Sequence, residues 1–251
     1  MQITNPFKIE SEAVRYQKYR PQYHHIPFNI IRNYVGKDFE SSLDVACGTG
    51  HSTFALAGLS QKTVGCDLSE AMLNEARKNF EIEFLQAGAE DLPFENSNFD
   101  LLNISMGFHW VEQGKFLKEA KRVLKKNGYL SIDNYGFLGQ ISQDAARQKR
   151  HYDFFEEYLT SASKRSGYPT QELIQSVGFE LVKEIKYDHQ ISLSSHEFVN
   201  LIMTWSNFQI LEGRQRSLTA RKMKEVYDEI FNDKKLELEF GGKTLLYKST
   251  I

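Results

Sequence analysis

Short apolar runs alternate with segments of helical period through the first half of the chain. The runs predict buried strands at 43–45, 63–66, 82–86, 101–105 and 129–134. The periodic segments predict helices at 27–35, 51–59, after Ser69 and at 112–126, with Gly128 in the turn that ends the last of them. This alternation indicates parallel βαβ units joined by right-handed crossovers.

The pattern changes after residue 136, where polar and aromatic residues mix. Helices are expected at 170–177, 195–208 and 219–231, and a strand within 181–192. Two further strands, at 236–240 and 245–248, flank Gly241-Gly242 and predict a hairpin. The extra helices are interpreted as insertions that form a cap over a substrate.

The chain of 251 residues is expected to form a single domain with insertions. Its expected parts are N-terminal lid helices (1–34), a cofactor-binding core (35–135), a mixed core and helical cap (136–235) and terminal strands (236–251). A monomer or weak homodimer is expected.

The composition is that of an ordinary globular protein, with 41% hydrophobic and 25% charged residues and a net charge of −2. The absence of a basic tail gives no support to a nucleic-acid partner. The sequence contains no apolar stretch long enough to span a membrane, and its first residues lack the apolar centre of a signal peptide. With only Cys47 and Cys66 as cysteines, a cytoplasmic protein with reduced thiols is expected.

A glycine turn follows the first predicted strand and is the most informative feature of the sequence. Gly48 and Gly50 permit a positive φ and let a ligand approach the backbone without meeting a Cβ atom. Asp67 ends the second strand, where a carboxylate can accept hydrogen bonds from both hydroxyls of a ribose. Together they predict a nucleoside pocket at the carboxyl ends of two parallel strands.

The residues around this turn bear on which nucleoside binds. A dinucleotide turn has a third glycine, but His51, Ser52 and Thr53 follow Gly50 here. Asp44 lies within the strand before the turn, where it either orients the turn or meets a cationic ligand. A carboxylate there would repel a pyrophosphate and attract a sulfonium, which favours S-adenosylmethionine over NAD.

Four segments resemble the signatures of class I S-adenosylmethionine-dependent methyltransferases, in the same order and spacing. The segments are Asp-Val-Ala-Cys-Gly-Thr-Gly (44–50), Cys-Asp-Leu-Ser-Glu-Ala-Met-Leu (66–73), Gln-Ala-Gly-Ala-Glu-Asp-Leu-Pro-Phe (86–94) and Ser-Asn-Phe-Asp-Leu-Leu (97–102). The resemblance covers about 35–135. Tyr-Arg-Pro at 19–21 and Phe-His-Trp at 108–110 are further similar to the branch of small-molecule enzymes that holds trans-aconitate methyltransferase.

The resemblance implies an α/β fold with a doubly wound, mostly parallel seven-stranded sheet (Rossmann-like), an N-terminal lid and helical cap insertions. It also implies a cofactor site that adds seven residues to Asp44, Gly48, Gly50 and Asp67, namely Arg20, Ala46, Leu68, Met72, Ala89, Glu90 and Met106. Arg20 would meet the methionine carboxylate of the cofactor. Met72 could instead be a core residue, and Glu90 an exposed loop acid.

A small-molecule acceptor is expected to contact a second set of residues, Tyr16, Tyr19, His109, Trp110, Tyr135 and Trp205. His109 is the candidate general base, because its ordinary pKa lies near neutrality. It could equally bind an acidic substrate or hydrogen-bond to the backbone and shape the loop. For Trp205, core packing beside Leu201 and Ile202 is the alternative.

Several signatures are missing from the sequence. The predicted fourth strand is not followed by Asp/Asn-Pro-Pro-Tyr/Phe, which argues against methylation of DNA bases. No metal-binding motif and no serine-hydrolase elbow occur. A small-molecule methyltransferase, whether an O- or an N-methylating enzyme, is therefore the predicted function. The alternatives are a non-catalytic S-adenosylmethionine-binding module and an NAD-dependent dehydrogenase.

Overall fold

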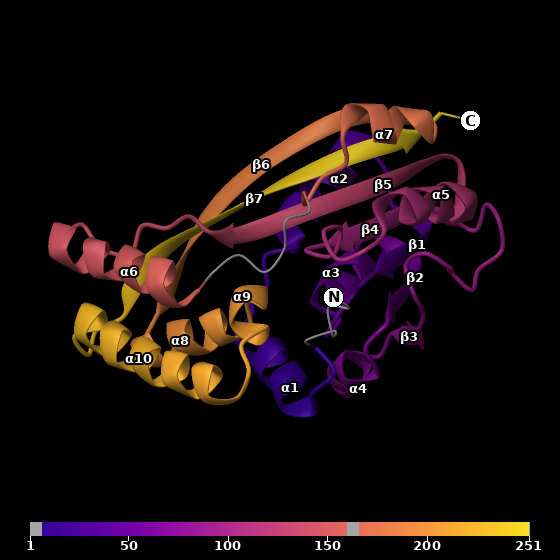
Figure 1. Cartoon of the computed structure of the whole chain (residues 1–251). Coiled ribbons are helices and arrows are strands. Elements are labelled where there is room, and N and C mark those ends of the chain that lie inside the picture. Colours follow the sequence, from indigo (N-terminus) through magenta and orange to yellow (C-terminus); the bar gives the residue numbers. More distant parts are fainter. Residues whose placement is uncertain (1–6, 160–165, 251) are drawn as a thin grey trace. The chain divides into compact units, whose positions relative to one another are not determined.

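The computed structural model describes residues 7–159 and 166–250, which divide into two compact units (Figure 1). The first, called here the core unit, comprises Pro21–Tyr135, Arg165–Tyr187 and Gly242–Ile251. The second, the helical unit, comprises Met1–Arg20, Gly136–Lys164 and Asp188–Gly241. The long strands β5, β6 and β7 contribute residues to both.

The described residues contain a seven-stranded sheet in the order β3-β2-β1-β4-β5-β7-β6. Its strands are β1 (Phe39–Val45), β2 (Ser60–Asp67), β3 (Glu83–Gln86), β4 (Phe99–Ser105), β5 (Leu124–Phe137), β6 (Phe179–Leu193) and β7 (Leu236–Ser249). The pairs β1–β2, β2–β3, β1–β4 and β4–β5 are parallel. The predicted mostly parallel seven-stranded sheet is confirmed.

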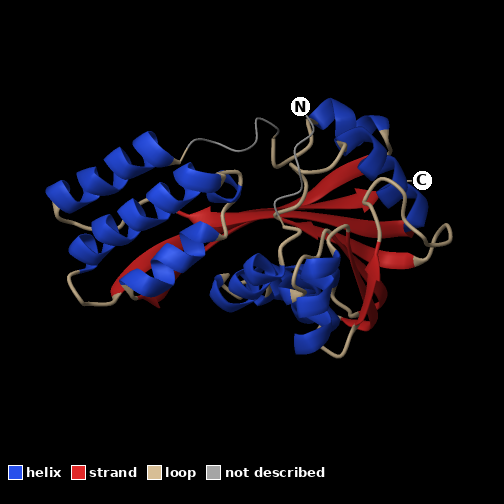
Figure 2. Ribbon diagram, turned by 60° about the horizontal axis from the view of Figure 1, so that its bottom comes forward, coloured by secondary structure: helices blue, strands red, loops and turns tan. Residues whose placement is uncertain are grey.

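The helices of the core unit pack against the sheet (Figure 2). They are α2 (His25–Val35), α3 (His51–Ala57), α4 (Glu70–Asn79), α5 (Gln113–Val123) and α7 (Gln171–Ser176). One apolar cluster joins Phe116, Leu117 and Ala120 of α5 to the strands. A second, separate cluster joins Leu73 and Ala76 of α4 to Cys47 and Phe84.

The helical unit contains α1 (Glu10–Tyr19), α6 (Ala145–Tyr158), α8 (Ser195–Met203), α9 (Ser206–Gln209) and α10 (Gly213–Phe231). The Glu12 carboxylate fastens α1 inside this unit. It accepts hydrogen bonds from Arg15 at 2.9 Å, Arg216 at 2.8 Å and Gln209 at 2.7 Å. In the same unit His151 bonds the Tyr227 hydroxyl at 2.9 Å, and burial lowers the pKa of His151 to about 4.

Two sequence expectations about element ends are wrong. The helix expected over 112–126 ends at Val123, because Leu124 has an extended backbone and pairs with Phe99 of β4. Gly128 therefore lies inside β5 rather than in a helix-ending turn. The helix expected over 195–208 is interrupted at Trp205, whose extended backbone (φ −77°, ψ 146°) separates α8 from α9.

The hairpin expected at Gly241-Gly242 is also absent, because β7 runs without interruption from Leu236 to Ser249. Gly242 has a packing reason instead. A Cβ atom on it would lie 2.4 Å from the Tyr187 hydroxyl and 2.9 Å from the Asn134 carbonyl oxygen. A glycine pair between apolar runs indicates a turn in sequence, but here the glycine makes room for a tyrosine ring.

Candidate functional site

The switch point of the sheet lies between β1 and β4, where the strand order reverses. In open α/β sheets ligands bind outside the carboxyl ends of the strands at this point. The strand β1 ends at Val45, and the residues after it form the glycine turn. Ala46 has a φ of 54°, Gly48 of 55° and Gly50 of 86°. An alanine with a positive φ is strained, and here it lies in the same turn as two glycines with a positive φ. Strained backbone of this kind is common at ligand sites.

Gly48 and Gly50 have different surroundings. A Cβ atom at Gly48 would meet nothing within 4 Å, so the space beside this backbone is open to a ligand. A Cβ atom at Gly50 would lie 2.9 Å from the Phe84 ring and 3.0 Å from Phe80. Gly48 therefore leaves room outside the turn, whereas Gly50 lets the start of α3 pack closely.

Asp44 is fully buried and hydrogen-bonded within the fold. Its carboxylate accepts from Ser52 at 2.6 Å, Thr53 at 2.7 Å and Asn103 at 2.7 Å. Burial raises the pKa of Asp44 to about 6 despite these three bonds. Of its two predicted roles, this geometry favours orienting the turn, because Asp44 ties β1 to α3 and β4.

Asp67 lies beside the turn at the end of β2. One carboxylate oxygen accepts from the Gly48 amide at 2.9 Å, and the other from the Ser69 amide at 2.8 Å. Burial raises the pKa of this carboxyl as well. The structure thus brings the predicted glycine turn and the predicted ribose acid into direct contact.

The residues after Asp67 differ in exposure. Leu68 is 62% exposed, which leaves an apolar side chain bare at the edge of the turn. Ser69 caps α4 as predicted, by accepting a hydrogen bond from the Met72 amide. Met72 itself is 3% exposed, in agreement with its alternative role as a core residue.

Ala89 and Glu90 follow β3, the neighbour of β2. The Ala87 amide donates to the Asp67 carbonyl oxygen at 3.1 Å, which holds this loop next to Asp67. Ala89 is buried, and Glu90 is half-buried. The Glu90 carboxylate accepts from the Glu112 amide at 2.7 Å, so Glu90 also fixes the loop that leads into α5.

Met106 follows β4 and has a φ of 55°. The next residue, Gly107, lies close to the glycine turn, since a Cβ atom on it would be 2.8 Å from the Ala46 Cβ. Phe108 is fully buried and anchors the loop, while His109 and Trp110 are half-buried with ring centroids 5.2 Å apart. The predicted His109 and Trp110 are therefore on the loop at the end of β4, as expected.

Four predicted residues belong to the helical unit. Arg20 lies over the Tyr16 ring, 4.7 Å from its centroid, and donates to the Thr204 carbonyl oxygen at 3.2 Å. Tyr19 bonds His196 at 3.1 Å. The half-buried Trp205 ring lies 5.7 Å from that of Phe155, which fits the packing alternative. Their predicted roles toward cofactor and acceptor stay predictions.

Sequence reasoning missed a buried acid, Asp133 of β5, which is 1% exposed. Four hydroxyl groups donate to its carboxylate: those of Tyr23, Ser105, Tyr187 and Thr244. The predicted acceptor residue Tyr135 follows two positions later and stacks on Tyr23 with a centroid distance of 3.6 Å. An acid directly after the apolar positions Leu130 and Ile132 was the available signal.

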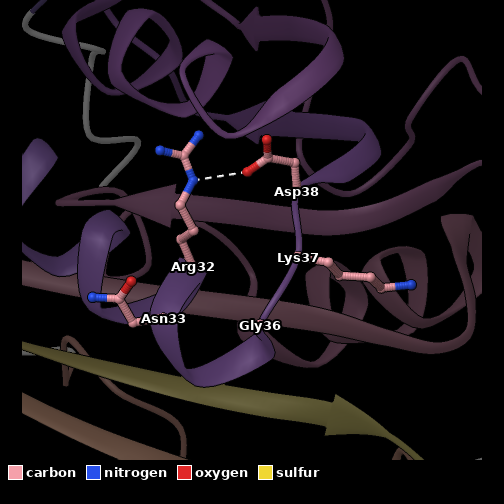
Figure 3. Close-up of a pocket in the computed structure, with 5 residues that line it drawn as sticks. All are labelled: Arg32, Asn33, Gly36, Lys37 and Asp38. Atoms are coloured by element: carbon pink, nitrogen blue, oxygen red, sulfur yellow. Dashed lines mark hydrogen bonds and ion pairs between the residues drawn. The ribbon is translucent and has the colours of Figure 1, made fainter.

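A shallow hollow on the core unit is unrelated to this site (Figure 3). Arg32, Asn33, Gly36, Lys37 and Asp38 line it, and Arg32 pairs with Asp38 at 2.8 Å. These residues precede β1, whereas the glycine turn follows β1. The hollow therefore lies at the amino end of the strand and not at its ligand-binding end.

Three further observations concern the cysteines, metal ions and membrane-spanning helices. Cys47 and Cys66 are buried free thiols, and burial raises the pKa of both. Among the described residues no group of three or more histidine, cysteine or acidic side chains is arranged to hold a metal ion. The helices within 7–159 and 166–250 include none that is both long and apolar enough to cross a bilayer.

Comparison with known proteins relates one segment of the chain to a family. Residues 43–132 match the family described as a methyltransferase domain. A Dictyostelium discoideum protein, provisionally named a methyltransferase, is 23% identical over 80% of this chain and 77% of its own length. The ubiquinone/menaquinone biosynthesis C-methyltransferase of Campylobacter jejuni is 39% identical over 41% of this chain, which spans only 47% of that enzyme.

Solved structures share the fold at low sequence identity. A protein of Anaeromyxobacter dehalogenans, provisionally named a type II methyltransferase, has a TM-score of 0.66 at 16% identity and covers 92% of this chain and 97% of its own. Haemonchus contortus phosphoethanolamine N-methyltransferase 2, in complex with S-adenosylhomocysteine, has a TM-score of 0.52 at 14% identity, over 94% of this chain and 57% of its own.

Residues 43–132 therefore match a methyltransferase domain, on a fold shared with solved methyltransferases. The matches support an enzyme of the S-adenosylmethionine-dependent methyltransferase class. The finer resemblance to trans-aconitate methyltransferase stays a prediction, as do the cytoplasmic location, the oligomeric state and the division into one domain.

Proposed function

We propose that the chain transfers a methyl group from S-adenosylmethionine to a small-molecule acceptor. The observation that carries this proposal is the contact between the Gly48 amide and the Asp67 carboxylate, 2.9 Å apart, beside a backbone that is open to a ligand. A ribose needs such an acceptor for its hydroxyls, and the adenosine needs such an approach to the backbone. The similarity to a ubiquinone/menaquinone biosynthesis C-methyltransferase supports a small molecule as the methyl acceptor.

The residues of the turn fit this cofactor. The Thr49 hydroxyl is buried and has no hydrogen-bond partner among the described residues, which leaves a polar group for a ligand. Leu68 offers bare apolar surface to the adenine. Asp44 and Asp67 are buried acids near the turn, and negative charge there favours a sulfonium over a pyrophosphate. The negative charge of these two acids therefore favours S-adenosylmethionine over NAD.

The cofactor supplies an electrophilic methyl group when bound, so the protein has to bind, align and exclude water. In the proposed division of labour, Asp67 holds the ribose, while Ala46, Ala89, Glu90 and Met106 border the cofactor. His109 and Trp110 lie on the acceptor side. Alignment of the acceptor with the methyl group can contribute several of the roughly 7–11 kcal/mol that orientation offers.

His109 is assigned to the acceptor side because it lies on the loop after β4. A neutral imidazole there can take the proton of a hydroxyl or amine acceptor, while a carboxylate acceptor needs no base. The proposed reaction is therefore O- or N-methylation with His109 as base, or carboxylate methylation with His109 as a binding group.

Calorimetry with S-adenosylmethionine, S-adenosylhomocysteine and NAD tests the proposal. Binding of the first two without NAD is the expected result, and binding of NAD alone would overturn it. Incubation with labelled S-adenosylmethionine and a metabolite extract then tests transfer. Cofactor binding without any labelled product would leave a non-catalytic binding module as the function.

A further inference from the structure

Asp133 is the feature of the core unit that the proposed function does not yet use. Its two oxygens accept four hydrogen bonds, from the hydroxyls of Tyr23 and Ser105 at 2.8 Å and those of Tyr187 and Thr244 at 2.7 Å. The set of these five residues is called here the Asp133 cage. Each cage member is at most 9% exposed.

The four donors come from separate segments of the core unit. Ser105 ends β4, Tyr187 lies on β6, Thr244 on β7, and Tyr23 precedes α2. A buried carboxylate with neutral donors is stable only while its hydrogen bonds are complete. The cage therefore ties three other strands and the segment before α2 to one point on β5.

The cage is directly connected to two predicted ligand residues. The Met106 amide donates to the Asp133 carbonyl oxygen at 2.8 Å, and the Tyr135 amide contacts the Met106 sulfur at 2.9 Å. The ring of Tyr23, whose hydroxyl is in the cage, stacks on that of Tyr135 with an angle of 8° between the planes. Asp133 is thus linked to Met106 through its backbone and to Tyr135 through the Tyr23 ring.

The cage residues also lie close in sequence to four places where the described chain passes into or out of the core unit. These places follow Arg20, Tyr135, Tyr187 and Gly241. Tyr187 is itself a boundary residue, and Tyr23, Asp133 and Thr244 lie two positions from the nearest boundary residue of the core unit, Pro21, Tyr135 and Gly242. A fixed point at these boundaries keeps the edge of the core unit in one conformation.

We propose that Asp133 is a positioning residue for methyl transfer, which holds Met106 and the stacked rings of Tyr23 and Tyr135 through its four hydroxyl donors. This inference rests on the proposed function. Asp133 need not touch cofactor or acceptor, because its carboxylate already accepts hydrogen bonds from the four hydroxyls of the cage. Its effect falls where β4 ends beside β5, on Met106 at the border of the proposed cofactor site and on Tyr135 on the acceptor side.

Thr244→Val is the sharpest test, because valine keeps the shape of threonine and removes one donor. Thr63→Val is the matched control: Thr63 is on β2 of the same sheet, and its hydroxyl bonds Ser42 at 2.9 Å, away from the cage. We expect hydrogen exchange of the Met106 and Tyr135 amides to speed up about tenfold or more in Thr244→Val, as befits a lost bond to a charged group. Thr63→Val should leave these two amides unchanged.

Rescue and catalysis complete the test. Thr244→Ser restores the hydroxyl and should restore slow exchange. In Thr244→Val, transfer of labelled methyl groups into a metabolite extract at saturating S-adenosylmethionine should fall about tenfold, while affinity for S-adenosylhomocysteine stays within about threefold. Tyr187→Phe, which removes a different donor, should reproduce the pattern if Thr244→Val does not fold.

Two results would overturn the proposal. One is unchanged exchange at Met106 and Tyr135 in both Thr244→Val and Tyr187→Phe. The other is equal acceleration in Thr244→Val and Thr63→Val, which would show a general loss of stability. Hydrogen exchange needs no methyl donor, so it tests the Asp133 proposal independently of cofactor binding. If calorimetry on the wild-type protein showed no binding of S-adenosylmethionine, that result would count against the proposed function alone.

Discussion

At the scale of single residues, buried acids dominate the candidate site. Asp44 and Asp67 lie at the carboxyl ends of β1 and β2, and Asp133 of β5 pairs with Ser105 at the end of β4. Burial raises the pKa of each of the three acids. Each is hydrogen-bonded by a different kind of donor: side chains for Asp44, backbone amides for Asp67 and hydroxyls alone for Asp133. The three acids are therefore open to separate tests.

The substitution Asp67→Ala should weaken binding of S-adenosylmethionine at least about tenfold, because it removes the acceptor of the Gly48 amide and, in the proposed site, that of the ribose hydroxyls. Isothermal calorimetry measures the change. Glu70→Ala is the control, since Glu70 is an exposed acid of the same segment that pairs only with Arg77 in the hydrogen bonds described. Equal affinity in wild type and Asp67→Ala would remove Asp67 from the cofactor site.

Asp44 makes stability depend on pH in a defined direction. Its pKa is about 6 in the folded chain against 3.8 for the free acid, so the folded state holds the proton more tightly. Its contribution to the free energy of unfolding is therefore present at low pH and is lost as the pH rises through 6. Relative to Asp44→Asn, the wild type should lose about 1 kcal/mol between pH 5 and pH 7.

Urea unfolding of both proteins across this range measures the effect. Parallel stability curves for wild type and Asp44→Asn would show that Asp44 has no raised pKa in the folded protein.

His109→Ala should lower the rate of methyl transfer more than the affinity for S-adenosylmethionine, because His109 is placed on the acceptor side. Transfer of labelled methyl groups into a metabolite extract, with calorimetry on the same preparation, separates the two effects. We expect a loss of about 10²-fold or more in rate if His109 is the base. An unchanged rate would reduce His109 to a residue that shapes the loop.

At the scale of elements, glycines at helix ends set how closely the helices pack. Gly36 ends α2 with a φ of 77°, and Gly50 precedes α3 with a φ of 86°. Both positions strain any residue with a Cβ atom. They differ in space, because the Cβ position is open at Gly36 and occupied at Gly50. Substitutions at Gly36 and Gly50 therefore distinguish the cost of backbone strain from the cost of steric overlap with neighbouring side chains.

Gly36→Ala should cost about 1–2 kcal/mol of stability, the strain of a left-handed alanine. Gly50→Ala should cost more, about 2–4 kcal/mol, since its Cβ atom would also lie 2.9 Å from Phe84. Thermal or denaturant unfolding gives both values. If the two variants were equally stable, the contacts of Gly50 with Phe84 and Phe80 would carry no energetic weight.

At the scale of the whole molecule, cofactor binding should stabilise the folded chain. A ligand at 100 times its dissociation constant adds about 2.7 kcal/mol to the free energy of unfolding. S-adenosylmethionine and S-adenosylhomocysteine should therefore raise the melting temperature in a concentration-dependent way, and NAD at the same concentrations should not. Stabilisation by NAD alone would reverse the choice of cofactor.

The sequence by itself determined the strands and helices of residues 43–105, the Ser69 cap and the position of the glycine turn and Asp67 at the ends of two parallel strands. These depend on local signals: apolar periodicity, glycines that need a positive φ, and a carboxylate at a strand end. The expected class of enzyme came from the resemblance of four segments in the same region to methyltransferase signatures, whereas the βα turns alone indicated a nucleoside pocket. Within one βα unit the signals lie close together in sequence, so the sequence alone predicts the positions of strand, turn and helix.

Only the tertiary structure decided what depends on distant partners. The continuous strand β7, the early end of α5 and the Asp133 cage each result from contacts between residues far apart in sequence, such as Gly242 with Tyr187 and Asp133 with Thr244. A glycine pair or a single acid in a strand looks the same in sequence whatever packs against it. Only the fold supplies the neighbours that decide their roles. Gly242 leaves space for the Tyr187 ring, and Asp133 accepts hydrogen bonds from hydroxyls of distant segments.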